Sequence, residues 1–389
     1  MKFLKIVNTW LLIFTLGFFS CNQESDYANG FIQTKFQPKE GIVNLEPIVQ
    51  APDLLHHLDE EQYQLNPHYA KRSIIQFRGG NNDLLEGYLL LPEEDRLVYN
   101  VVVLLHGSGG ALDGNNPNTD SFTGINSLTP QLEEWVAEMH DREFAVFVIN
   151  SFKSPNRTLP QGEPDYIGVE PPNDVGFAPY MVRAEDVKRG VSRISWLRTF
   201  GQSKFIGEIA LVGFSHGATA AIAAIHDYNY TGGRMAQNPM LKWSVKEGDN
   251  EYDIQNGYQA PFSVSTINIE AAIAYYGGTY CFGYFTDYFP GEGVAVKYRM
   301  NNNLMIHHGE DDADIDIGTV NNPGKTTTRA FVDRVQNGGA NQGVFLDFHA
   351  YQNTGHSFDR PSQNAGNNQA SRALARTRSF NYLNQHIGY

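Results

Sequence analysis

The hydrophobic and polar positions of the chain follow two alternating patterns. Short, almost wholly apolar runs predict buried strands, since a parallel strand is covered on both faces; they span residues 100–105, 144–149, 209–212, 269–274, 303–307 and 344–351. Between them, residues 129–141 and 183–200 have apolar positions at helical spacing, and the alanine-rich run 218–225 also favours a helix. This order predicts an α/β domain with a mostly parallel central sheet and helices on both faces.

The same patterning predicts how the domain begins and where it is interrupted. Residues 73–77 and 84–91 are strand-like runs separated by a glycine- and asparagine-rich turn, which is typical of a β-hairpin. Two segments, 151–180 and 227–265, are too long to be simple connections, and we interpret them as insertions in a domain that spans residues 70–389. The first is a candidate substrate wall, and the second is either a small cap or surface decoration.

The first residues have the pattern of a targeting segment. Lys2 and Lys5 precede an apolar run, and a small residue stands directly before Cys21. Residues 1–20 are therefore predicted to be a signal peptide, and the junction is similar to that of bacterial lipoproteins, in which the cysteine is lipidated. Ordinary cleavage, giving a periplasmic or secreted protein, is the alternative. We interpret the polar residues 21–69 as a tether, so the protein is expected to be exported and anchored through Cys21 on the periplasmic side or at the cell surface.

Composition and charge narrow the range of partners. The chain has 389 residues, of which 41% are hydrophobic, so it can build a large core. Its formal net charge of -14 argues against a nucleic-acid partner, because phosphates require a basic surface. Two cysteines, Cys21 and Cys281, are too few for a disulfide framework, and Cys281 is interpreted as a buried thiol. The composition leaves the oligomeric state open.

Candidate chemistry centres on residues 208–217, which read E-I-A-L-V-G-F-S-H-G. A buried strand runs into the pattern G-x-S-x-G, and the alanine-rich helix follows at once. On such a sharp turn a serine projects its hydroxyl clear of the sheet, and the helix N-terminus adds N–H donors where an oxyanion would form. We interpret Ser215 as a nucleophile; a plain tight turn is the alternative.

A glycine-rich loop, H-G-S-G-G at 106–110, follows the strand at 100–105. Such a loop lets backbone N–H groups approach a ligand closely, and after this kind of strand it supplies the second half of an oxyanion hole in serine hydrolases. A phosphate-binding loop is the alternative, but neither G-K-[ST] nor G-x-G-x-x-G is present.

A serine nucleophile requires a histidine base and a carboxylate, each expected on a loop after a later strand. The strand at 303–307 leads into a loop with four candidate acids, Glu310, Asp311, Asp312 and Asp314. A solvated acidic loop and, more weakly, a calcium site are the alternatives. His356 follows the last strand in a flexible loop and is the candidate base, whereas three other histidines fall within or at the ends of strands and are interpreted as packed: His307, His308 and His349.

Substrate contacts are less well defined. Arg157, in the first insertion, could neutralise an anionic group, although a solvated arginine is at least as well supported. Aromatic residues, including Tyr276 and Tyr280, crowd the segment after the strand at 269–274. They suit an aromatic or sugar-ring substrate, and ordinary packing explains them equally well.

Five ordered motifs together resemble the dienelactone hydrolase family of α/β-hydrolases. They are H-G-S-G-G at 106–110, S-F-x-S-P-N-R at 151–157, G-F-S-H-G at 213–217, H-G-E-D-D at 308–312 and Y-x-x-x-G-H-S-F at 351–358. The resemblance implies the α/β-hydrolase fold, a triad of Ser215, Asp312 and His356, and an oxyanion hole formed by backbone N–H groups of His216, Gly107, Ser108 and Gly109. The namesake enzymes carry cysteine where this chain has serine, which argues against dienelactone itself as the substrate.

These features predict a serine-dependent carboxylic-ester hydrolase that needs no metal and no organic cofactor. Its expected partner is a small-molecule or glycan-linked ester. A serine peptidase of the prolyl-oligopeptidase type shares the fold and the triad order, but the chain has no room for a propeller before residue 100. A surface binding lipoprotein that has lost catalysis is the alternative from another class.

Overall fold

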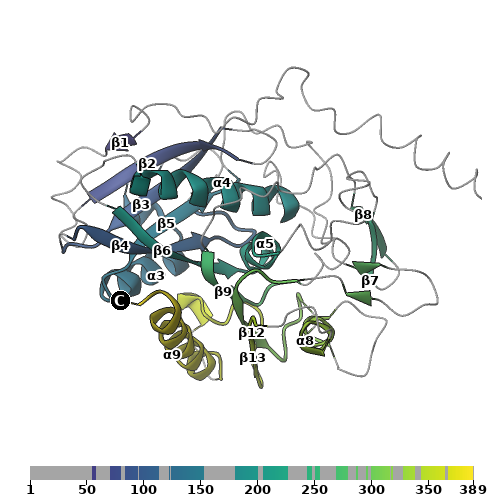
Figure 1. Ribbon diagram of the computed structural model, residues 1–389. Helices are drawn as coiled ribbons and strands as arrows, with labels where there is room; N and C mark the ends of the chain where they lie inside the picture. The colour runs from purple at the N-terminus through teal and green to yellow at the C-terminus, as the bar shows by residue number, and fades with distance from the viewer. Residues whose placement is uncertain are drawn as a thin grey trace, which may run out of the picture.

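The fold is described from a computed structural model (Figure 1). The described residues are 55–57, 71–79, 84–94, 96–113, 122, 124–152, 180–199, 205–226, 243–247, 250–254, 269–278, 286–287, 295–296, 299–315, 317–318, 327–337, 343–363 and 367–388. The predicted signal peptide, Cys21, Arg157 and Tyr280 lie outside them, as does most of both predicted insertions.

Nine strands of the described part of the chain form one sheet. In chain order they are β1 (Leu55–His57), β2 (Lys71–Arg78), β3 (Leu84–Leu91), β4 (Val98–Leu105), β5 (Ala145–Asn150), β6 (Phe205–Phe214), β9 (Ile269–Tyr275), β12 (Asn303–Gly309) and β13 (Leu346–Tyr351). Their spatial order is β1-β2-β3-β5-β4-β6-β9-β12-β13. Pairing is antiparallel from β1 to β5 and parallel from β5 to β13. The predicted hairpin, the mostly parallel sheet and the α/β-hydrolase fold are thereby confirmed.

Helices cover both faces of this sheet (Figure 1). One apolar core includes side chains of α4 (Tyr180–Thr199), α5 (His216–Ala224) and α8 (Thr328–Asn337), and the other includes side chains of α3 (Pro130–His140) and α9 (Asn367–Ile387). Successive residues of β4 alternate between the two cores: Val101 and Val103 join the first, and Val102 and Leu104 join the second. The unbroken apolar run in the sequence follows from this burial on both faces.

Two helices were not expected from the patterning. α9 reads N-N-Q-A-S-R-A-L-A-R-T-R-S-F-N-Y-L-N-Q-H-I, and few of its residues are strongly apolar. It is nonetheless held by a narrow buried stripe that includes Ala375, Phe380 and Leu383. α8 is similarly polar overall and buries Phe331 and Val335. Both helices depend on tertiary packing more than on intrinsic propensity.

Short strands also form within the predicted tether and within the second predicted insertion. β1 lies within the predicted tether and pairs with β2 at the edge of the sheet. Part of the second predicted insertion forms an antiparallel pair, β7 (Trp243–Glu247) with β8 (Asn250–Ile254), and a further short pair joins β10 (Thr286–Asp287) to β11 (Ala295–Val296).

Among the described helices, none combines the length and the apolar character needed to cross a membrane.

Candidate active site

Ser215 stands at the turn between β6 and α5, in a backbone conformation that non-glycine residues rarely adopt. Its φ is 50° and its ψ is -118°. The two flanking glycines are required by close backbone contacts: a Cβ on Gly213 would lie 2.3 Å from the Gly217 carbonyl oxygen, and one on Gly217 would lie 2.2 Å from the Leu105 oxygen. The strained turn and both glycines are features of a nucleophile elbow, as the G-x-S-x-G pattern indicates.

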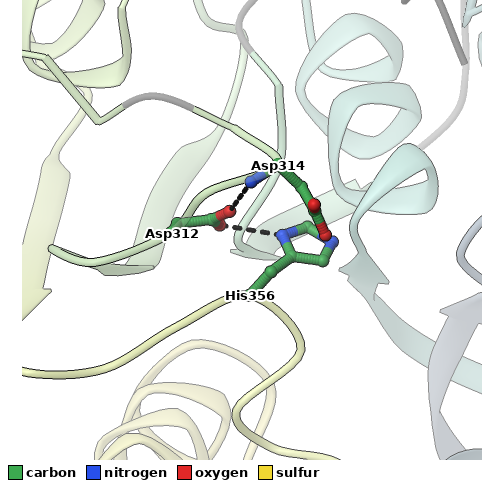
Figure 2. Close-up of side chains that lie close together, drawn as sticks. All are labelled: Asp312, Asp314 and His356. Atoms are coloured by element: carbon green, nitrogen blue, oxygen red, sulfur yellow. Dashed lines mark hydrogen bonds and ion pairs between the residues drawn. The ribbon is translucent and has the colours of Figure 1, made fainter.

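His356, in the loop after β13, reaches the serine across 141 positions of sequence. Its Nε2 lies 3.2 Å from the Ser215 Oγ, and its Nδ1 lies 2.8 Å from the Asp312 Oδ2 (Figure 2). Because a carboxylate only accepts, Nδ1 carries the proton and Nε2 is left to accept the proton of the serine hydroxyl. The three side chains therefore form a connected line from carboxylate to imidazole to hydroxyl.

The Asp312 carboxylate is held from several sides. Its Oδ1 accepts hydrogen bonds from the backbone N–H groups of Asp314 (3.0 Å) and Ile315 (2.8 Å). Its Oδ2 lies 3.3 Å from His308 Nε2 as well as accepting from His356. Burial alone would raise the pKa of Asp312, but the hydrogen bonds from His308 and His356 hold it well below the ordinary carboxyl value. Asp312 is therefore ionised at neutral pH.

The other three candidate acids are placed differently. Glu310 pairs with Arg329 at 2.5 Å, and Asp311 and Asp314 are exposed. Figure 2 shows the Asp314 carboxylate beside the His356 ring, while Asp312 alone is joined to Nδ1. Ligand atoms of Asp312, Asp314 and His356 lie within 4.8 Å of one another, so a cation could fit here by distance. A cation bound at the Asp312 carboxylate would compete with the Nδ1 proton of His356.

The glycine-rich loop lies directly beside the serine. A Cβ on Gly107 would be 3.4 Å from the Ser215 Cβ and 3.4 Å from the Phe214 carbonyl oxygen. The loop closes in a turn in which the Gly110 N–H donates to the Gly107 carbonyl at 3.2 Å. Ser108 is partly exposed, Gly109 has open space around it, and His216 begins α5 with a buried side chain. Of the four residues expected to supply oxyanion donors, Gly107 and His216 are thus placed directly beside Ser215, and Ser108 and Gly109 continue the same loop.

Tyr276 is a correction to the expected substrate contacts, because its side chain is fully buried. Its hydroxyl donates to Asp359 Oδ1 and accepts from Gln131 Nε2 at 2.6 Å. The Tyr276 ring meets the His356 ring edge to face, with centroids 4.8 Å apart. Tyr276 therefore packs against the His356 ring, and its buried side chain is not placed to contact a substrate.

Two further residues near the site were missed by the sequence patterns. Asp359 is fully buried and also accepts from Gln131 Nε2 at 2.7 Å and from Trp135 Nε1 at 3.0 Å, which ties the His356 loop to α3. Arg360 extends to the glycine-rich loop, where its Nη2 would lie 3.9 Å from a Cβ on Gly107. Their position just after His356 was the only available signal.

Of the three histidines interpreted as packed, His307 and His308 are fully buried and His349 is partly exposed. His307 is fully buried, with Nδ1 2.8 Å from the Tyr351 hydroxyl and Nε2 3.0 Å from the Ser379 hydroxyl. His349 stacks on His307 and binds Asp347 at 2.9 Å. His308 is fully buried as well. Its contact with Asp312 was not predicted from the spacing of the two residues in the sequence.

Comparisons with known proteins find one family for part of the chain. Residues 257–387 match the dienelactone hydrolase family, a range that includes Asp312 and His356 but not Ser215. No curated protein sequence matches the chain.

Solved structures with a similar chain path include an esterase from Pyrococcus furiosus (14% identity, 82% of this chain and 93% of that one, TM-score 0.43). A dienelactone hydrolase-like promiscuous phosphotriesterase from metagenomic libraries has 12% identity, 82% and 99% coverage, and a TM-score of 0.43. A putative dienelactone hydrolase from Klebsiella pneumoniae has 13% identity, 80% and 99% coverage, and a TM-score of 0.42. These likenesses are too distant to bear on substrate. What the comparisons establish is that residues 257–387 of this α/β-hydrolase-fold chain are similar to the dienelactone hydrolase family.

Proposed function

We propose that the protein is a serine-dependent carboxylic-ester hydrolase with Ser215, His356 and Asp312 as its triad. The observation that carries the proposal is the placement of His356, whose two ring nitrogens lie 3.2 Å from the serine hydroxyl and 2.8 Å from the Asp312 carboxylate. A serine hydroxyl is a weak nucleophile by itself, and an oriented neutral imidazole is the group that activates it. The strained φ at Ser215 further supports a functional role for this turn.

The reaction follows from these contacts. Ser215 Oγ attacks the ester carbonyl carbon while its proton passes to His356 Nε2, and the ionised Asp312 stabilises the imidazolium. The resulting oxyanion faces backbone N–H groups of His216 and of the loop that contains Gly107, Ser108 and Gly109. His356 then protonates the leaving alcohol, and a water molecule, deprotonated by His356, releases the acyl group as a carboxylic acid. Every proton that moves is carried by the chain's own residues, so neither a metal nor an organic cofactor is required.

The first test is hydrolysis of p-nitrophenyl esters from acetate to octanoate, combined with labelling by a fluorophosphonate. Activity confined to the short esters and lost in Ser215→Ala would indicate a small acyl pocket, whereas no hydrolysis together with intact labelling would indicate a selective entrance. Mass spectrometry should find one phosphonyl adduct, on the peptide that contains Ser215. A non-catalytic binding protein would neither hydrolyse the esters nor react with the probe, and an adduct on another serine would contradict the assignment.

Arg360 suggests that the preferred ester carries a negative charge. Its guanidinium lies close to Gly107, since Nη2 would be 3.9 Å from a Cβ built there, and the same Cβ would be 3.4 Å from the Ser215 Cβ. A charge-assisted hydrogen bond contributes about 1.5–3 kcal/mol, or roughly 10-fold or more in binding. Arg360→Gln is therefore expected to raise KM for mono-p-nitrophenyl succinate about 10-fold and to leave KM for p-nitrophenyl acetate within about 2-fold.

The matched control for this prediction is Arg96→Gln. It removes the same charge, but Arg96 precedes β4, whereas Gly107 follows the other end of that strand. Steady-state kinetics with both substrates distinguish the two variants. Equal changes in KM for the charged and the neutral ester in Arg360→Gln would show that Arg360 does not select for charge.

A further inference from the structure

A second group of buried polar residues lies beneath the serine, and Arg183 of α4 is at its centre. The Arg183 side chain is fully buried. Its Nη1 lies 2.8 Å from His216 Nδ1, and its Nη2 lies 2.8 Å from the His106 carbonyl oxygen. A planar guanidinium donates from both nitrogens at once in a fixed geometry, so these two acceptors are held at a set separation.

The two acceptors belong to the two segments that border the reacting oxygen. His216 directly follows Ser215, and His106 directly precedes Gly107. The first segment begins α5 after β6, and the second follows the neighbouring strand β4. Arg183 therefore connects, from the core side, the two backbone segments that would supply the oxyanion donors.

The protonation states of both histidines follow from their partners. Arginine only donates, so His216 Nδ1 must accept and the imidazole is neutral. Burial, and then the positive charge of Arg183, hold the pKa of His216 well below its ordinary value. His106 Nε2 accepts from the Ser151 N–H at 3.2 Å, so His106 Nδ1 carries the proton that it donates to the Gly107 carbonyl at 2.7 Å.

These bonds also set the direction of the loop's amide groups. The Gly107 carbonyl receives hydrogen bonds from His106 Nδ1 and from the Gly110 N–H. Because a trans peptide unit is planar, the N–H of Ser108 points opposite to that carbonyl. Phe152 completes the arrangement, since its ring lies 5.1 Å from the Arg183 guanidinium carbon and meets the His106 ring edge to face at 4.5 Å. The side chains of Arg183, His106, His216 and Phe152 are all buried, which restricts movement of the loop where it begins at His106.

We propose that Arg183 is a positioning residue that sets the two halves of the oxyanion hole relative to each other. The inference rests on the proposed hydrolase function, because it assigns Arg183 a part in that same reaction. Arg183 touches no substrate; it acts through the backbone at His216 and at His106. Since oxyanion stabilisation acts on the transition state, the loss of Arg183 should lower kcat and leave KM nearly unchanged.

The test is Arg183→Lys, which keeps the charge but has a single nitrogen in place of the fork. Removing one oxyanion donor outright lowers kcat by roughly 10²–10³-fold, so a misplaced donor should lower kcat for p-nitrophenyl acetate by about 10–100-fold. Affinity for a boronic acid that mimics the tetrahedral oxyanion should fall by a similar factor, while KM stays within about 2-fold. Arg189→Lys, on the same helix and paired with Glu185, is the matched control and should keep kcat within about 2-fold.

Two further variants address the case in which Arg183→Lys does not fold, as judged by its melting temperature. His216→Ala removes the acceptor of Nη1 and should lower kcat at constant KM. His216→Asn offers an amide oxygen near the position of Nδ1 and should recover much of the lost kcat, which a loss of packing alone would not produce.

The outcomes separate the inference from the function on which it rests. Wild-type protein that neither hydrolyses esters nor reacts with a fluorophosphonate would refute the proposed function. An active wild type together with unchanged kcat in folded Arg183→Lys, or in His216→Ala if the lysine variant does not fold, would overturn the role of Arg183. Equal activity of His216→Asn and His216→Ala would likewise show that the hydrogen bond to Arg183 does not matter.

Discussion

Replacing Ser215 with alanine is expected to lower kcat for p-nitrophenyl acetate by on the order of 10⁶-fold. The substitution removes the only atom that bonds to the acyl group, and His356 then has no hydroxyl to deprotonate. The fold should be retained, because the Ser215 hydroxyl makes no capping hydrogen bond to α5. Serine and alanine both carry a Cβ, so the backbone conformation at this position costs alanine no more than it costs serine. Stopped assays with high enzyme concentration are needed to measure the residual rate.

Ser127→Ala serves as the matched control for this variant. The Ser127 hydroxyl donates to the Gly124 carbonyl at 2.5 Å and has no part in the triad. We expect its kcat to equal that of the wild type, and we expect fluorophosphonate labelling to persist there and to disappear in Ser215→Ala. Wild-type turnover in a folded Ser215→Ala protein would rule out Ser215 as the nucleophile.

Asp312→Asn is expected to lower kcat by on the order of 10⁴-fold with little change in KM. An amide at this position no longer fixes the proton on His356 Nδ1 and no longer stabilises the imidazolium. Asp311→Asn is the matched control, since Asp311 is adjacent in sequence but exposed. If Asp312→Asn stays active while Asp314→Asn is inactive, the carboxylate beside the His356 ring in Figure 2 is the acid instead.

The same variant should change how stability depends on pH. The folded state holds the pKa of Asp312 well below the unfolded value of about 3.9, so the wild-type carboxylate stabilises the fold above that value. This contribution is lost as the pH falls below about 4 toward the folded-state pKa. Urea unfolding should therefore show Asp312→Asn less stable than the wild type at pH 7, with a difference that narrows as the pH drops below about 4.

The strands and the order of the site residues were predictable because they rest on local patterns. Each central strand is covered on both faces, so its sequence is an unbroken apolar run that stands out from the polar loops. The glycines around Ser215 stand out in the sequence as the pattern G-x-S-x-G; Gly213 is required by a contact within the turn, whereas Gly217 is required by the backbone of β4. Residues that follow parallel strands meet at one edge of a sheet, and this brought Ser215, Asp312 and His356 within reach of one another.

Other elements lacked such a local signal. α9 is polar along most of its length and is a helix because a few side chains pack on the sheet. Tyr276 lies in an aromatic-rich segment in which a core residue and a substrate contact look alike, and only its buried hydroxyl bonds distinguish them. Arg183 had the pattern of any arginine on an amphipathic helix, although it is completely buried.

By itself, then, the sequence determined the fold class, the strained turn at Ser215 and the chain order of serine, acid and histidine. Tertiary structure decided that Asp312, and not its neighbours, accepts the hydrogen bond from His356 Nδ1, and that Arg183 joins His216 to His106. The physical reason is that the acid loop's carboxylates differ by one or two positions, and side-chain direction on a turn depends on hydrogen bonds to distant residues. Spacing along a chain carries no information about such contacts, because they form only when separate strands and helices pack together.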